Sequence, residues 1–426
     1  MSNQTPGSRP LALPDAPNIE WLRKQAKQRL KELRDASADV KLADAQLDVA
    51  RRYGFSSWRA LKAHIDSLTI DGQLFDAART GDVDKLRSLL DAHPEKLYAR
   101  DKPYEHTLLH IAARHGHLAA VDLLLQRGID PNTREKGDNT YPMHWAAAAG
   151  HLDVVRRLAD AGGDVVGEGD DHAGQVIGWA TGWEGCDDAT HRSMADFLVS
   201  RGARHHIYSA MAINDAEEVR RIVAADPSQL RRPQSHNEDF RLPLHFAVHK
   251  KLRRMISLLL KLGADPLATD ASGFTAVAYA TEPDIDRPVL EAIHQRVGAT
   301  LLTSVGVEDW EAAERIVHHD PSAVNEDGVL HLMAKRGNAG AVQWLLDHGA
   351  NPSALWNHWG AMVTALHLAA LSNHPDVARV LLDSGADPTI RDSMHDSDAR
   401  GWASFFRRTE IVELIERSSR TRGLAQ

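Results

Sequence analysis

The sequence contains very little cysteine and no long apolar run. Cys186 is the only cysteine among 426 residues, so the chain cannot form an internal disulfide or a zinc site built from cysteines. This cysteine usage is typical of proteins in a reducing compartment, and we therefore expect a cytoplasmic protein. Because no stretch of about 18 apolar residues is present, the sequence predicts neither a membrane-spanning helix nor a membrane partner.

Motifs that hold metals or phosphates are also missing. The sequence has 24 histidines, but it has no HExxH motif and no Cys/His spacing typical of a zinc site. It also lacks a glycine-rich phosphate loop and a GxSxG nucleophile motif. We therefore expect no metal site and no cofactor.

The charge is unevenly distributed. Residues 1–70 carry twelve Lys and Arg against eight Asp and Glu, which leaves 38 against 51, or −13, for the remainder. An acidic body argues against a nucleic-acid partner, because phosphate binding needs clustered cations. The basic residues of 23–31 could contact an anionic surface or simply form the solvated face of one helix.

What the sequence does contain is a repeat of about 33 residues. One pattern recurs in five segments, which are TLLHIAARHGH (107–117), YPMHWAAAAGH (141–151), LPLHFAVHKKL (242–252), VLHLMAKRGN (329–338) and TALHLAALSNH (364–374). Apolar helical segments such as ISLLLKLGADPL and ARVLLDSGADPT follow them. These residues resemble the ankyrin-repeat family, whose units read T-P-L-H, A-A, G-H, L-L and G-A-D. The resemblance implies an all-α solenoid of about eleven helix pairs joined by hairpin loops.

The residue types agree with this fold on physical grounds. Alanine pairs such as Ala112 and Ala113 let neighbouring first helices approach closely, and the second helices carry an apolar stripe that includes Leu381. Glycines such as Gly128 and Gly385 follow the second helices, where a left-handed cap is needed. No unit buries its apolar face alone, so stacking must stabilise the array.

The sequence predicts five segments, of which the three sub-stacks follow from breaks in the repeat pattern. We expect a flexible leader at 1–17, a three-helix N-terminal cap at 18–69, and repeats in three sub-stacks at 70–205, 206–299 and 300–426. Within the cap, Trp58, Leu61, Ile65 and Leu68 are expected to point inward. The cap segment resembles the helical leader of bacterial ankyrin-repeat proteins. A DNA-reading helix-turn-helix is the alternative for three short helices, and the acidic body argues against it.

The family resemblance implies that hairpin tips and first helices line a concave binding groove. The predicted groove residues are Asp170, Trp179, Trp183, Glu238, Phe240, His249, Trp356, Trp359, Arg400 and Trp402. The first helices add Lys335 and Arg336, among others. Glycine stands where the repeat has histidine in Gly178–Trp179 and Gly401–Trp402, and the freed space predicts a close approach by a backbone or a ligand.

Two functions remain open. The family resemblance implies a binding module whose groove recognises a partner protein or a small-molecule ligand. The alternative is a cofactor-independent lyase, isomerase or hydrolase with acid–base groups in an aromatic pocket. Its candidate catalytic residues are Asp171, His172, Glu184, His236, His358, His395 and Asp396. Adjacent pairs such as Asp171/His172 and His395/Asp396 could supply a base and the group that orients it.

Each of these residue types also has a structural explanation. The repeat histidines (His110, His144, His245, His331 and His367) resemble the histidine that hydrogen-bonds between turns in the family. Aspartates before hairpin glycines are often turn formers, and the tryptophans could fill gaps between neighbouring hairpins.

Overall fold

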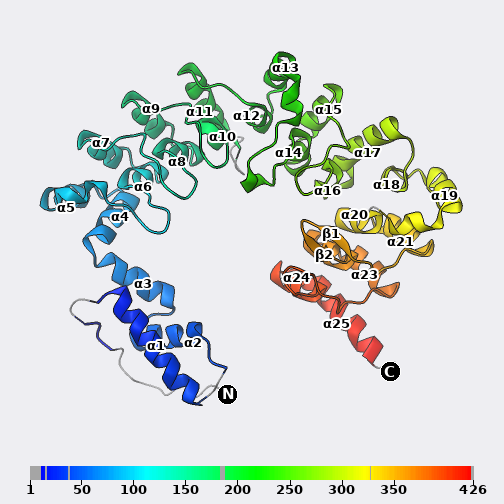
Figure 1. Ribbon diagram of the computed structural model, residues 1–426, viewed down its shortest axis with the longest axis horizontal. Helices are drawn as coiled ribbons and strands as arrows, with labels where there is room; N and C mark the ends of the chain where they lie inside the picture. The colour runs from blue at the N-terminus through cyan, green and yellow to red at the C-terminus, as the bar shows by residue number, and fades with distance from the viewer. Residues whose placement is uncertain (1–10, 15–16, 37–38, 183–187, 327, 424–426) are drawn as a thin grey trace. The chain divides into compact units, whose positions relative to one another are not determined.

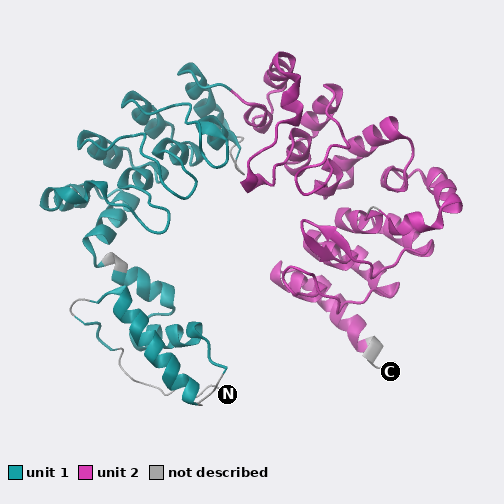
Figure 2. Ribbon diagram, in the orientation of Figure 1, with its two compact units in different colours: residues 1–204 teal, residues 205–426 magenta. Residues whose placement is uncertain are grey.

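The computed structural model describes residues 11–14, 17–36, 39–182, 188–326 and 328–423. Its contacts divide the chain into unit 1, residues 1–204, and unit 2, residues 205–426 (Figure 2). Within the described residues, no helix has both the length and the apolar character needed to cross a bilayer.

Unit 1 begins with three helices, α1 (Ile19–Ala36), α2 (Leu42–Arg52) and α3 (Trp58–Ser67). Leu22, Val49, Leu61 and Ile65 form their small shared core. Leu68 was expected to point inward with them, and this prediction is wrong. It lies just beyond the end of α3, and 49% of its surface is exposed.

The rest of unit 1 is a stack of helix pairs (Figure 1). Its elements are α4 (Ile70–Thr80), α5 (Val83–Ala92), the 3-10 helix η1 (Pro94–Tyr98), α6 (Leu108–Arg114), α7 (Leu118–Gln126), α8 (Pro142–Ala148), α9 (Leu152–Asp160), α10 (Gln175–Thr181) and α11 (Ala189–Ser200). The first helices α4, α6, α8 and α10 pack in one row, and the second helices α5, α7, α9 and α11 pack in another. Alanines at the row contacts, such as Ala112 and Ala146, are fully buried.

Unit 2 continues the same plan with one small sheet. Its elements are α12 (Ile207–Ala212), α13 (Ala216–Ala225), η2 (Pro227–Arg231), η3 (His236–Glu238), α14 (Pro243–His249), α15 (Arg253–Lys261), α16 (Ala276–Tyr279), α17 (Pro283–Val297), α18 (Leu301–Val307), α19 (Trp310–His319), η4 (Pro321–Asn325), α20 (Val329–Arg336), α21 (Ala339–Asp347), β1 (Trp356–His358), β2 (Ala361–Val363), α22 (Ala365–Ser372), α23 (Pro375–Asp383), α24 (Ala399–Phe405) and α25 (Thr409–Gly423). In the described part of the chain, the helices from α4 to α25 make eleven consecutive pairs. The all-α fold expected from the sequence is therefore confirmed, and the three sub-stacks stay a prediction.

The repeat histidines connect successive repeats by hydrogen bonds, as expected. In each case the ring Nε2–H donates to a carbonyl oxygen of the following hairpin. The acceptors are Thr140 for His110 (3.2 Å), Gly167 for His144 (3.1 Å), Phe274 for His245 (2.9 Å), Ala354 for His331 (2.9 Å) and Ser397 for His367 (3.1 Å). These bonds satisfy buried polar groups at every junction that has the histidine.

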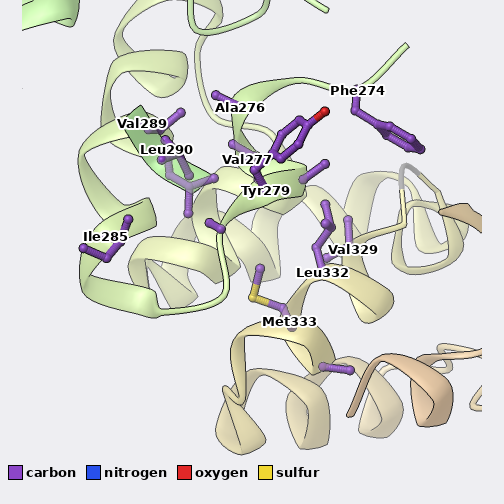
Figure 3. Packing of buried hydrophobic residues seen from close by; sticks show 14 of the residues in the cluster. Phe274, Ala276, Val277, Tyr279, Ile285, Val289, Leu290, Val329, Leu332 and Met333 are labelled. Atoms are coloured by element: carbon purple, nitrogen blue, oxygen red, sulfur yellow. The ribbon is translucent and has the colours of Figure 1, made fainter. Parts of the chain in front are cut away.

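The seventh pair, α16 and α17, departs from the regular plan. The Val277 oxygen accepts from the Ala280 N–H at 3.1 Å. Because the first helix α16 is a single turn, its last carbonyls lack the further partners that a longer helix would supply. Two cations of the ninth pair take their place, because Lys335 Nζ donates to the Ala278 oxygen and Arg336 Nη2 donates to the Val277 oxygen at 3.1 Å. Figure 3 shows α16 residues such as Tyr279 beside Leu332 and Met333 of α20. The first helices of the seventh and ninth pairs therefore make direct contact.

Candidate functional site

Two predicted groove tryptophans are held by aspartates of their own hairpins. The indole N–H of Trp179 donates to Asp170 Oδ1 at 3.1 Å, and that of Trp402 donates to Asp392 Oδ2 at 2.9 Å. Trp179 is buried, and Trp402 is half-buried. Both tryptophans therefore help to fix hairpins in place.

Asp170 is itself a turn former. It accepts hydrogen bonds from the backbone N–H groups of Gly174 and Gln175. Burial acts to raise the pKa of this carboxyl, but the bonds from Trp179 and the backbone outweigh it and hold the pKa below its usual value.

The close approach predicted at Gly401 comes from the chain itself. A Cβ atom at this position would collide with Oγ of Ser397. The Ser397 side chain therefore occupies the space that glycine frees at Gly401, and no ligand is needed to explain the glycine.

The expected acid–base pairs Asp171/His172 and His395/Asp396 do not form, so this prediction is wrong. His172 Nε2 lies 3.4 Å from Asp138 Oδ1, while the Asp171 side chain is exposed. The same holds in the last hairpin, where His395 Nδ1 lies 3.2 Å from Asp392 Oδ1, and exposed Asp396 pairs with Arg391 at 2.7 Å. Consecutive side chains on a hairpin point in different directions, which separates the members of each expected pair.

The remaining predicted residues are dispersed. His236, Phe240, His249 and Arg400 are exposed, and Arg400 pairs with Glu416 at 2.6 Å. Glu238 accepts a hydrogen bond from the hydroxyl of Ser235 in its own turn. Trp183 and Glu184 lie outside the described residues.

Unit 2 does bring several candidates together around a buried charge cluster. Lys335, Arg336 and Asp286 are 1%, 3% and 0% exposed, and Arg336 forms an ion pair with Asp286. Burial and the charge of Arg336 lower the pKa of Lys335 from 10.5 to about 7, although the charge of Asp286 opposes the shift. The cluster contains two cations and one carboxylate, so one positive charge is not balanced within it.

The β1–β2 hairpin covers this cluster. Its strands pair in antiparallel register with His358 opposite Ala361, and Trp359 and Gly360 form the turn. Lys335 Nζ lies 4.4 Å from the centroid of the Trp359 ring, at cation–π distance. The ring of His358 packs 4.0 Å from that of Trp359, and the ring of Tyr279 lies 5.9 Å from it.

His358 is a buried histidine with an unused nitrogen. Its side chain is 3% exposed, and within the described chain its Nε2 has no hydrogen-bond partner. Burial, with smaller contributions from Lys335 and His331, lowers the pKa of His358 to about 3. The imidazole is therefore neutral at physiological pH. Trp356 on the same strand packs against the apolar core and under Gly328, as a gap-filling residue does.

The same hairpin exposes apolar side chains beside the next repeat. Trp359, Met362 and Met394 are 40%, 38% and 56% exposed. A Cβ atom on Gly360 would lie 3.5 Å from Cε of Met394, so Met394 lies against the turn. Met362 N–H donates to Ser393 Oγ at 2.8 Å, which ties the two hairpins together. We call these three side chains the hairpin patch.

Sequence reasoning identified Trp359, Lys335, Arg336 and His358 as candidates, but it did not identify Asp286 or the two methionines. Asp286 lies in a helical segment, where it is an acidic residue beside the apolar residues Ile285, Val289 and Leu290. Met362 and Met394 follow no repeat pattern. In the described residues there is no group of three or more His, Cys, Asp or Glu side chains that could hold a metal ion.

Comparison with known families gives matches along the repeat region. The model described as "Ankyrin repeats (3 copies)" matches residues 74–169 and 303–392, and the single "Ankyrin repeat" model matches residues 239–271. These matches lie in both units and include Trp359 and Met362 of the hairpin patch.

Several curated proteins are similar over part of their length. A putative E3 ubiquitin-protein ligase XBAT31 of Arabidopsis thaliana is 28% identical over 44% of this chain and 39% of its own length. The mouse B-cell lymphoma 3 protein homolog is 28% identical over 45% of this chain and 46% of its own. A probable E3 ubiquitin-protein ligase XBOS33 of rice is 27% identical over 68% of this chain and 40% of its own. The chain thus spans less than half the length of these relatives, which are plant and mammalian proteins and give no support to a bacterial type.

Among solved structures, the human ASB11 ankyrin repeat domain matches 51% of this chain and 96% of its own length. The sequence identity is 20% and the TM-score is 0.37.

Proposed function

Because this chain belongs to the ankyrin-repeat family, we propose that it binds a partner protein, and that the hairpin patch is the centre of the contact. The observation that carries this proposal is the exposure of Trp359, Met362 and Met394 at the tips of two consecutive hairpins. Tryptophan and methionine are enriched in protein interfaces, and tryptophan is frequent among the residues that dominate the binding energy.

The backbone that carries the patch is held in position. The β1–β2 ladder fixes Met362, and its N–H donates to Ser393 Oγ while its carbonyl accepts from Ser393 N–H at 3.3 Å. Rigid presentation reduces the conformational entropy that is lost on binding, so these side chains can contribute more of their buried area to affinity.

The relatives support a binding role without identifying the partner. Their names include ubiquitin ligases and a lymphoma protein homologue, and the matched region is less than half of each. A common catalytic activity does not follow from names that differ in this way, whereas a recognition function is compatible with all of them. We also propose a cytoplasmic location, which the single cysteine supports.

The test compares partner capture by the full chain and by matched variants. The triple variant Trp359→Ala, Met362→Ser, Met394→Ser removes the patch, and Phe405→Ala removes another side chain of unit 2, which is 80% exposed. Proteins retained by the wild type and by Phe405→Ala, and lost by the triple variant, support the proposal. Equal retention by all three chains contradicts it, provided that circular dichroism gives the same unfolding midpoint for each.

A further inference from the structure

We propose that Lys335 and His358, which pack against Trp359, form a binding site for a carboxylate of the bound partner, supplied by an acidic side chain or a C-terminus. This inference rests on the proposed function, because it assigns the chemistry of one contact made beside the hairpin patch. It starts from three side chains that α20 and the β1–β2 hairpin bring together in unit 2.

The cluster carries a positive charge on Lys335 that no carboxylate of the cluster balances. Asp286 neutralises Arg336 through their ion pair, and Lys335 then has no carboxylate of its own. The acceptors that the structure gives Lys335 Nζ are the Ala278 carbonyl and the π face of Trp359. An ammonium has three N–H donors, so its bonding capacity is not filled. A buried cation without a balancing anion is costly, and a bound carboxylate would remove that cost.

The second argument is the unused nitrogen of His358. Its Nε2 has no hydrogen-bond partner in the described chain, although the side chain is 3% exposed. Buried polar atoms are normally hydrogen-bonded, so an unpaired one beside a cation points to a missing ligand. A neutral imidazole with its proton on Nε2 would donate to one carboxylate oxygen while Lys335 donates to the other.

A carboxylate of the partner must also be able to reach Lys335. Trp359 lies between the Lys335 ammonium and the hairpin surface, and 40% of its own surface is exposed. The ring face is a weaker partner for an ammonium than a carboxylate is. A rotation of this one exposed indole would let an anion replace it on Lys335 without moving the helices.

Other titratable groups face the lysine from each neighbouring element. Arg336 and His331 come from α20, Asp286 from α17, Tyr279 from α16 and His358 from β1. Burial keeps His331 neutral by lowering its pKa to about 4, and burial raises the pKa of the Tyr279 hydroxyl. Burial raises the pKa of Asp286 to about 6, although the charges of Arg336 and Lys335 oppose the shift. Lys335 and Asp286 are therefore the groups in this set whose charges change near neutral pH.

The experiment uses propionate as a model of a partner carboxylate and propionamide as its uncharged control. Each is titrated into the full chain at constant ionic strength, and binding is read from the shift in the thermal unfolding midpoint. We expect propionate to raise the midpoint more than propionamide does when the pH is below the pKa of Lys335. Above that pKa the propionate affinity should fall about tenfold for each pH unit, because the lysine loses its charge.

Variants then locate the site. Lys335→Met should abolish the difference between propionate and propionamide, and His358→Phe should reduce it. Lys250→Met, which removes a cation at the end of α14, should leave it unchanged. Trp359→Ala should keep or strengthen propionate binding, whereas the proposed function expects the same change to weaken partner capture.

Three outcomes would overturn the inference. They are an equal response to propionate and propionamide, a propionate response that persists in Lys335→Met, and a response that does not change with pH. The propionate titrations of the wild-type chain at different pH values test the proposal even if Lys335→Met does not fold. None of these outcomes affects the capture experiment on the hairpin patch, so the two proposals fail separately.

Discussion

Trp402 donates its indole N–H to the carboxylate of Asp392, ten residues earlier in the chain, at 2.9 Å. Trp179 makes the equivalent bond to Asp170 at 3.1 Å, and the Tyr279 hydroxyl donates to Asp270. In three repeats, therefore, an aromatic residue of the first helix is bonded to an aspartate of the preceding hairpin. The interaction joins each hairpin to its helix by a bond that the consensus pattern of the repeat does not contain.

This bond leads to a prediction for the last hairpin. Asp392 also accepts from the backbone N–H groups of Met394, His395 and Ser397. Asp392→Asn replaces one acceptor oxygen by an amide that cannot accept, and we expect unfolding to require about 1–3 kcal/mol less free energy.

Asp396→Asn is the matched control, because this carboxylate is exposed and pairs only with exposed Arg391. Its effect on urea denaturation should be close to zero. Equal destabilisation by the two changes would show that the buried acceptor has no special role.

The buried charge cluster predicts a marked difference between two neighbouring cations. Arg336→Met leaves Asp286 buried without its partner, and we expect a loss of about 3–5 kcal/mol in the free energy of unfolding. Lys335→Met removes the unbalanced cation and keeps the ion pair of Arg336 with Asp286. Its cost should be below about 1 kcal/mol. Urea denaturation of both variants at neutral pH measures this difference, and similar losses would contradict the charge assignment.

The lysine also predicts how stability depends on pH. Lys335 has a pKa of about 7 in the folded protein against 10.5 for an ordinary lysine. Between these values the unfolded chain binds more protons than the folded one, so stability rises with pH in this window. The slope for one proton is at most about 1.4 kcal/mol per pH unit.

Lys335→Met should lack this gain, so the stability difference between wild type and variant must change across the window. Measuring both chains by urea denaturation from about pH 7 upward isolates the lysine, because all other titrating groups are common to both. A constant difference would mean that Lys335 keeps an ordinary pKa.

The apolar core gives a simpler prediction. Leu381 of α23 is fully buried, as its place in the apolar stripe predicted. Leu381→Ala should lower the free energy of unfolding by about 2–5 kcal/mol, because the cavity that it leaves is not refilled. Leu355→Ala, at a leucine that is 48% exposed in the same unit, should change it little. A silent Leu381→Ala would contradict the packing of the tenth pair.

The parts of this structure that were predictable from the sequence are those that repeat. His110 and His367 occupy equivalent positions 257 residues apart and make equivalent bonds, because each position sees the same local surroundings. Residues such as Leu381 follow from the 3.6-residue period of a helix packed on one side. The family resemblance and the physical pattern led to the same fold.

The candidate site was less predictable, because it depends on departures from the repeat. Lys335 donates to Ala278, 57 residues earlier, where α16 ends after a single turn. No local pattern encodes that contact. Likewise, the expected pair His395 and Asp396 follows from adjacency in sequence, whereas the observed partner Asp392 follows from the three-dimensional turn.

The short helix α16 affects how unit 2 unfolds. In an ordinary array each repeat touches only its immediate neighbours, so unfolding can stop at any boundary. The bonds from Lys335 and Arg336 to α16 pass over the eighth pair and fasten the seventh to the ninth. The backbone amides of α16 and α20 should therefore become accessible to hydrogen exchange in a single cooperative step. This region should resist local unfolding that starts at either end of unit 2.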